Sequence, residues 1–222
     1  MRYALFRAPR KTAPTKRTDR LCSCFIAVCG ILALTVGLWG CGSARPIKYY
    51  QLNYPTTATV APDAIDTTLM VHTFEASHLY LDDKIVYGFD GPEMGTYETQ
   101  RWAEPPVEIL QNALVRGLRS SGRFRGVYTL RADTNGQFIV AGQLYDFKEV
   151  DSNPIVARLR YEVRLRDRKS GKTVWNHVYS HDESASDKSV SSFVVAMDKN
   201  VQRSVQEVQA GLEEYFHTHP LN

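Results

Sequence analysis

Apolar and polar residues alternate most regularly between residues 155 and 168, where five apolar side chains are interleaved with four arginines and a glutamate. A period of two places one set on a buried face and the other in water, so this stretch predicts a half-buried β-strand. Short turns join it to strands predicted at 137–150 and 173–180, which favours antiparallel pairing of the three. Other strand-like stretches lie at 49–53, 67–74, 84–89 and 94–100.

Two stretches carry apolar residues at three- and four-residue intervals, the spacing of amphipathic helices. The first begins at Pro106, whose missing N–H suits a first helical position, and ends before Gly122. The second runs from Val190 to Phe216 after a polar loop at 181–189. Residues 124–130 are assigned to no strand. About six or seven strands and two substantial helices, not regularly interleaved, predict a mixed-sheet α/β or α+β domain.

The N-terminal pattern is different. Residues 21–41 are almost entirely apolar and follow a segment with seven basic residues and a single acidic one, which is typical of a secretory signal. Leu38-Trp39-Gly40-Cys41 looks like a lipobox, which predicts cleavage after Gly40 and a diacylglycerol group on the Cys41 thiol. The alternative is an uncleaved anchor, because 21–39 is long enough to span a bilayer. Both interpretations export the rest of the chain.

We therefore divide the chain into a removed signal peptide (1–40), a lipidated tether (41–48) and one domain (49–217). The tether from 42 to 48 reaches at most ~25 Å, so the domain stays close to its membrane. Gly42 stands where an Asp would favour retention in the inner membrane, so we expect the periplasmic face of the outer membrane. No cysteine follows Cys41, so the exported domain depends on its hydrophobic core and has no disulfide.

Removal of the leader reverses the sign of the net charge. The full chain has a net charge of +3, but the leader holds seven of its 27 basic residues and one of its 24 acidic residues. The mature part is therefore mildly acidic, at −3. This leaves no electrostatic case for a nucleic-acid partner.

Candidate catalytic chemistry is sparse. The chain contains no nucleophile elbow, phosphate-binding loop or dinucleotide glycine pattern. His177 and His181 fall on and just after a strand, where their spacing separates them by ~13 Å and argues against a shared metal. The acidic pair Asp82-Asp83 does not converge with another pair on one bond, as general acid–base catalysis requires. We predict no catalytic residue, no metal, and no cofactor beyond the diacylglycerol and N-acyl chains on Cys41.

Two features suggest partner binding. The polar positions of the 155–168 strand are a basic face formed by Arg158, Arg160, Arg164 and Arg166. This face is either a solvated surface or a docking face for an acidic partner or lipid headgroups. Cross-strand neutralisation would favour the solvated surface, and the candidate carboxylates are Asp146, Glu149 and Glu183.

The second feature precedes the first helix and comprises Arg101, Trp102, Pro105 and Pro106. A tryptophan before a Pro-Pro helix start either packs inward and fixes where the helix begins, or is an exposed aromatic anchor for a partner. We predict that this group docks a partner.

Several motifs together resemble one family. They are the lipobox, Tyr49-Tyr50-x-Leu52, the Lys84–Tyr87 segment, and the Arg101–Pro106 string that opens a helix ending in Ser-Gly-x-Phe. This pattern resembles the ABC-type transport auxiliary lipoproteins, the family of the paraquat-inducible protein C lipoprotein, from Cys41 to about Phe216. The resemblance implies a three-layer α/β sandwich on a mixed, partly antiparallel sheet with two main helices.

The resemblance also implies a function. The protein would be a non-enzymatic, periplasm-facing subunit of an intermembrane phospholipid transport system, with an ABC transporter and a mammalian-cell-entry (MCE) protein that forms a lipid tunnel. It would dock that tunnel at the outer membrane and support envelope integrity; assembly as a homo-oligomer is left open. The alternatives are an outer-membrane-assembly or envelope-structural lipoprotein, or a periplasmic hydrolase.

Overall fold

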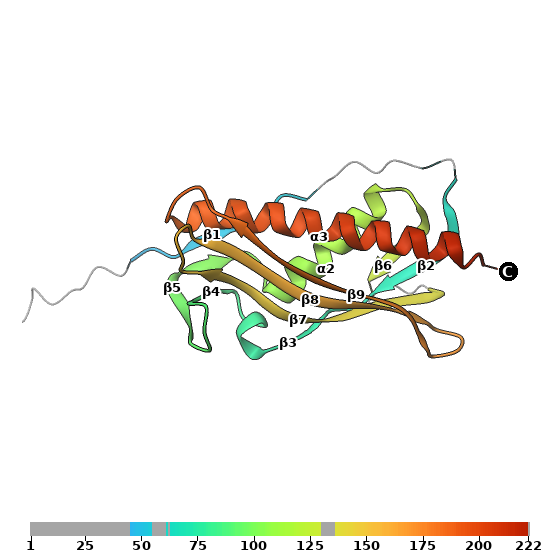
Figure 1. Cartoon of the computed structure of the whole chain (residues 1–222), viewed down its shortest axis with the longest axis horizontal. Helices are drawn as coiled ribbons and strands as arrows, with labels where there is room; N and C mark the ends of the chain where they lie inside the picture. The colour runs from blue at the N-terminus through green and yellow to red at the C-terminus, as the bar shows by residue number, and fades with distance from the viewer. Residues whose placement is uncertain (1–44, 55–60, 62, 130–135, 222) are drawn as a thin grey trace, which may run out of the picture. The chain divides into compact units, whose positions relative to one another are not determined.

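The computed structural model describes residues 45–54, 61, 63–129 and 136–221 (Figure 1). From Pro46 on, the described residues belong to one unit, Pro46–Asn222. The predicted signal peptide, the cleavage site at Gly40 and the lipidation site at Cys41 lie outside the described residues. In the part that is described, no helix has the length and apolarity needed to cross a membrane.

Nine strands form one mixed sheet in the described part of the chain. They are β1 (Lys48–Tyr50), β2 (Ile65–Val71), β3 (Glu75–Ala76), β4 (Lys84–Gly88), β5 (Met94–Trp102), β6 (Phe124–Thr129), β7 (Phe138–Val150), β8 (Val156–Asp167) and β9 (Thr173–Ser184). The helices are α2 (Pro106–Ser120) and α3 (Val190–Thr218), with a short 3-10 turn, η1 (His78–Tyr80).

Strand β7 organises the sheet. One of its edges pairs in succession with β2, β3 and β4, all parallel to it, while the other edge pairs with antiparallel β8. Beyond these, β6 lies beside β2, β5 and β1 lie beside β4, and β9 lies beside β8. The sheet is therefore parallel around β2 and β6 and antiparallel from β7 to β9.

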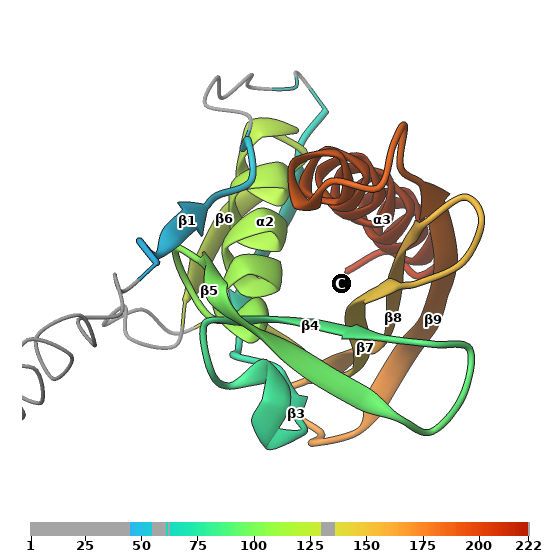
Figure 2. The same ribbon diagram turned by 90° about the vertical axis from the view of Figure 1, so that its left-hand side faces the viewer.

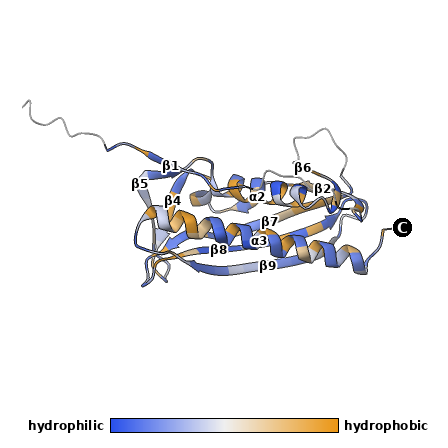
Figure 3. Ribbon diagram, turned by 90° about the horizontal axis from the view of Figure 1, so that it is seen from above, coloured by the Kyte–Doolittle hydropathy of each residue, from blue (hydrophilic) through white to orange (hydrophobic). Residues whose placement is uncertain are grey.

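The sheet curves around its two helices, as the view along α3 shows (Figure 2). Helix α3 packs on β8, β9 and α2, while α2 packs on β6 and β2. Apolar and polar residues alternate along both helices (Figure 3), as expected for helices with one buried stripe. On β8 the inward residues Ala157, Leu159, Tyr161, Val163 and Leu165 are completely buried.

Most of the predicted architecture is confirmed. The structure is a mixed, partly antiparallel α/β sheet with two main helices, consistent with a layered sandwich. The period of two on β8 and the antiparallel β7–β8–β9 ladder are as expected. Pro106 is the first residue of α2, and Gly122 follows its end at a φ of 64°, a conformation that glycine adopts without steric cost.

Several elements differ from the sequence prediction, and three of them show why. Strand β1 ends at Tyr50 because its partner β5 ends opposite, at Trp102. The polar stretch after residue 180 continues β9 to Ser184, since β8 offers a partner up to the pair Val156 and Ser184. Residues of β6 form a strand that the sequence analysis missed, because their partner β2 is remote in sequence. In each case long-range pairing decides the structure, and local pattern does not.

Candidate functional site

Trp102 lies in the core at the end of β5. Its side chain is 0% exposed, and its ring centroid is 5.4 Å from that of Phe147 and 5.9 Å from that of Phe193. Its backbone N–H donates to the carbonyl oxygen of Asp83 at 2.7 Å. The interpretation of Trp102 as an exposed anchor is therefore wrong, because the indole has no surface to offer, and the inward-packing alternative describes this residue.

The other members of the predicted docking group, Arg101, Pro105 and Pro106, make contacts within the fold. Arg101 is half-buried and donates to the Asp83 carboxylate at 2.8 Å. The carbonyl of Pro105 accepts the backbone N–H groups of Glu108 and Ile109, both at 2.9 Å, and Pro106 is buried. These contacts fix the start of α2 and hold the short segment between Trp102 and Pro105 at the surface.

A small hollow opens beside that segment. It measures about 250 Å³ and is lined by Tyr50, Gln51, Leu52, Asn53, Tyr54, Ala103, Glu104, Ile109 and Arg116. The guanidinium of Arg116 lies 4.7 Å from the centre of the Tyr54 ring, and burial raises the pKa of the Tyr54 phenol to about 12. The Glu104 carboxylate accepts from the Asn112 amide at 2.7 Å. The hollow thus combines a neutral phenol, a carboxylate and a guanidinium.

A larger hollow of about 510 Å³ lies between the two helices. Its walls are Asn53, Tyr54, Ala113, Gly117, Ser120, Val201, Gln202, Val205, Gln206 and Gln209. The helices approach closely at Gly117, where an added Cβ would lie 2.2 Å from Val205 Cγ1. Because both hollows share Asn53 and Tyr54, we treat them as one surface, the α2–α3 groove. Carboxamides and small apolar side chains suit it to binding a partner segment.

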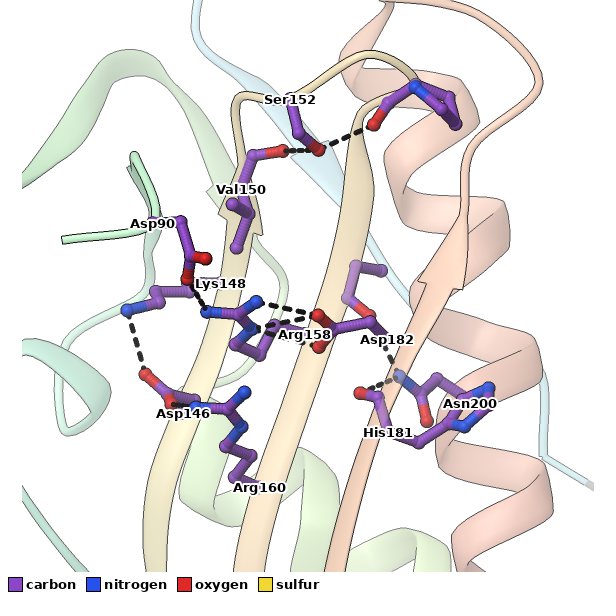
Figure 4. A network of polar contacts seen from close by, with 12 residues as sticks. Asp90, Asp146, Lys148, Val150, Ser152, Arg158, Arg160, His181, Asp182 and Asn200 are labelled. Carbon is purple, nitrogen blue, oxygen red and sulfur yellow. Dashed lines mark hydrogen bonds and ion pairs between the residues drawn. The ribbon is translucent and has the colours of Figure 1, made fainter.

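Arg158, from the predicted basic face, is buried and neutralised. It is 8% exposed and donates from Nε and Nη2 to Asp182, at 2.9 and 2.7 Å, and from Nη1 to Asp90 at 2.8 Å (Figure 4). The guanidinium lowers the pKa of the Asp182 carboxyl. The prediction that Arg158 is part of an open cationic surface is therefore wrong. Its guanidinium is paired with the cross-strand carboxylate of Asp182, which was not among the predicted partners.

The remaining arginines of this face do not form one surface with Arg158. Arg160 lies 3.6 Å from Asp146, which also pairs with buried Lys148 at 3.0 Å. Arg164 lies 3.9 Å from Glu162. Arg166 is exposed and donates to the backbone carbonyl of Gly171 at 2.8 Å.

Of the three carboxylates expected to neutralise the face, one does so. Asp146 pairs with Arg160, as expected. Glu149 instead accepts from the Tyr97 hydroxyl at 2.8 Å, and Glu183 pairs with Arg203 at 3.1 Å. The inward direction of Glu149 and Glu183 on their strands explains why neither reaches the basic face.

The two strand histidines have separate partners. His177 Nε2 lies 3.6 Å from Glu207, whereas His181 Nε2 accepts from Arg203 at 2.8 Å and lies 3.3 Å from Glu183. Within the residues that the structure describes, no group of three or more histidine, cysteine or acidic side chains is placed to hold a metal ion.

The sequence analysis missed one buried polar residue. Asn200 on α3 is completely buried, and its amide donates to the carbonyls of Ala157 and His181 at 2.8 and 3.0 Å. Its side-chain oxygen accepts from the Tyr179 hydroxyl at 2.6 Å. An asparagine within the apolar stripe of a long helix was the available signal. It fixes α3 against β8 and β9.

The family model for the ABC-type transport auxiliary lipoprotein component matches residues 50–209. The chain therefore belongs to this family. No protein with curated annotation matches it.

Solved structures share the fold. The crystal structure of protein XCC0632 from Xanthomonas campestris, of the DUF330 family, aligns with a TM-score of 0.65 at 17% identity, covering 74% of this chain and 93% of that one. The crystal structure of an uncharacterized protein aligns with a TM-score of 0.61 at 13% identity, covering 76% of this chain and 99% of that one. At such identities the likeness concerns the fold alone.

Proposed function

We propose that this protein is a periplasm-facing lipoprotein subunit of an ABC- and MCE-type intermembrane phospholipid transport system. Acyl chains on Cys41 anchor it in the outer membrane, where it docks the transport tunnel and supports envelope integrity. The observation that carries the proposal is membership of the transport auxiliary family over residues 50–209. The lipobox-like Leu38-Trp39-Gly40-Cys41 supports the anchoring step.

The proposed role is non-enzymatic. The polar side chains that could have served in catalysis do not converge: Asp83 pairs with Arg101 and Asp82 with Lys84 at 3.4 Å, while His177 lies 3.6 Å from Glu207. A docking subunit needs preorganised surface and no nucleophile. The Pro-Pro start of α2 supplies such a surface, since it holds the rim of the α2–α3 groove rigid and lowers the entropic cost of binding. We therefore propose this groove, whose rim includes Ala103 and Glu104 between Trp102 and Pro105, as the tunnel-docking surface.

The experiment compares Cys41→Ala with wild type in cells that depend on the protein. We expect Cys41→Ala to abolish metabolic labelling with palmitate, to leave a slower-migrating precursor, and to lose function. Cys29→Ala, in the leader but outside the lipobox, is the matched control and should be labelled normally. Processing and fractionation of Cys41→Ala as wild type would refute the anchoring.

The proposal that the protein catalyses no reaction is tested separately in the same cells. Single alanine substitutions at His177, His181, Asp82 and Asp83 should leave cellular function intact while the protein remains folded. Loss of function in a folded variant would favour a hydrolase instead.

A further inference from the structure

Positive charge is concentrated at the turn between β8 and β9. The β8–β9 tip, residues 164–172, contains five cations and one acidic residue. The cations are Arg164, Arg166, Arg168, Lys169 and Lys172. All of them except Arg164 are exposed. The tip therefore carries a net charge of +4, although the mature chain as a whole is acidic.

The one acidic residue of the tip is occupied by the turn itself. The Asp167 carboxylate accepts the backbone N–H groups of Lys169 at 2.9 Å and Ser170 at 3.2 Å. Hydrogen bonds from Ser170 and from the Lys169 backbone lower the pKa of the Asp167 carboxyl. Asp167 thus favours its ionised form and caps the backbone of the turn.

Six described arginines outside the tip pair with carboxylates. Examples are Arg101 with Asp83, Arg123 with Asp63 and Glu213, Arg125 with Asp66, Arg158 with Asp90 and Asp182, and Arg203 with Glu183. Among the described residues, no carboxylate lies within ion-pair distance of Arg166, Lys169 or Lys172. These three cations therefore have no carboxylate partner in the described part of the chain.

The turn that presents these cations is well ordered by hydrogen bonds. Asp167 donates its N–H to the Lys172 carbonyl at 2.9 Å, and Gly171 donates to the Asp167 carbonyl at 2.9 Å. Gly171 has a φ of 71°, which a residue with a side chain rarely adopts. Because the backbone is preorganised, a ligand of the tip orders only the lysine and arginine side chains.

A hollow with polar and apolar walls adjoins the cations. It measures about 540 Å³ and is lined by Gly136, Gln137, Phe138, Asp167, Arg168, Lys169 and Leu221. Leu221 is exposed there, and Phe138 packs on Phe216 with ring centroids 5.0 Å apart. A ligand that fits this arrangement carries several negative charges and an adjacent apolar side chain.

The tip lies at the opposite end of the sheet from the start of the domain. Strand β1 runs parallel to β5, so the chain before Lys48 comes from the end where β7 finishes at Val150. The tip instead follows the pair Phe138 and Asp167 at the beginning of β7 (Figure 1). Strand β7 has 13 residues and so spans ~43 Å. The tip and the point where the chain enters β1 therefore lie toward opposite ends of the sheet.

We propose that the β8–β9 tip binds an acidic segment of a protein partner, with carboxylates on Arg166, Lys169 and Lys172 and an apolar side chain in the adjoining hollow. This rests on the proposed function, since that function places the anchor at Cys41, in the chain that leads into β1. A protein partner is favoured over lipid headgroups because the chain that leads to the proposed anchor enters the domain toward the other end of the sheet. Complementary charge of this kind speeds association and excludes wrong partners.

The test measures binding of a fluorescein-labelled 16-residue peptide, four repeats of Glu-Glu-Leu-Glu, to the acylated chain in non-ionic detergent by fluorescence anisotropy. Binding should weaken with added salt, because the Debye length shortens. Reversing two charges in Lys169→Glu/Lys172→Glu should weaken binding at least tenfold. The control Lys188→Glu/Lys199→Glu changes the net charge equally at exposed sites and should bind within twofold of wild type.

Equal peptide affinity of the tip variant and the control variant would overturn the proposal. So would tip-dependent binding to vesicles of phosphatidylcholine and phosphatidylglycerol (3:1) without binding to the peptide, which would assign the tip to a lipid surface. Melting temperatures equal to wild type establish that both variants fold. Failure of the proposed function appears separately, as normal processing of Cys41→Ala, whatever the tip binds.

Discussion

Replacing Trp102 by alanine removes the largest fully buried side chain of the described core. The indole packs edge-on to Phe147 and tilted against Phe193, so it joins β5, β7 and the first turn of α3. Since the side chain is 0% exposed, the substitution leaves a cavity that only a shift of these three elements could close.

The expected loss of stability follows from the burial of the Trp102 side chain. Truncation of a buried Trp or Phe to Ala costs ~3–5 kcal/mol. For a domain of this size, each kcal/mol lowers the melting temperature by ~2–4 °C, so we expect a decrease of ~6–20 °C. Trp102→Phe should cost less, because it keeps an aromatic ring in place. It also loses no hydrogen bond, since the buried Nε1 has no partner among the described residues.

The assay is thermal unfolding followed by circular dichroism, with peptide or partner capture measured on the same preparations. Val178→Ala is the control, because Val178 is 60% exposed and should melt within about 2 °C of wild type, as surface substitutions usually do. A Trp102→Ala protein that melts with the control but loses partner capture would refute the core assignment and restore the exposed anchor.

Three further predictions concern buried polar groups and are read from melting temperatures. Arg158→Ala should cost ~1.5–3 kcal/mol by removing charged hydrogen bonds to Asp182. This loss of stability should shrink in acid, as the Asp182 carboxyl, whose pKa is lowered, becomes protonated. A pH-independent loss would contradict the pairing. Asn200→Ala should cost ~1–3 kcal/mol, because three buried partners lose a hydrogen bond; an unchanged melting temperature would exclude that role. Burial raises the pKa of the Glu149 carboxyl, so the folded state favours its protonated form and stability falls as pH rises through that pKa. Glu149→Gln should therefore melt higher than wild type at pH 7 and lose this advantage below the ordinary pKa of 4.5. A lower melting temperature of the variant at pH 7 would contradict this.

Local pattern was sufficient for the elements whose structure depends on a single periodicity. The alternation on β8 and the stripe on α3 each bury one face of a regular element, so reading the period also gave the buried residues. Pro106 and Gly122 marked the ends of α2 because their backbone preferences are intrinsic to the residue.

The candidate site was less predictable because it depends on which strands become neighbours. The carboxylate that neutralises Arg158 is Asp182, and their contact exists only because β9 extends beyond the point where its alternation ends. The same holds for Trp102, whose burial depends on Phe147 and Phe193 from remote segments. A sequence shows that an arginine or tryptophan is present, but its exposure is decided by long-range packing.

The central claim is that this chain is an acylated accessory subunit of a phospholipid transport system. Its most direct test is quantitative mass spectrometry of the proteins and lipids that co-purify with the full-length chain from crosslinked membranes, with Cys41→Ala in parallel. An MCE-domain protein, ABC transporter components and phospholipid should be enriched with wild type and lost with Cys41→Ala. Enrichment of outer-membrane assembly factors without any transporter component, or equal recovery of partners with both proteins, would contradict it.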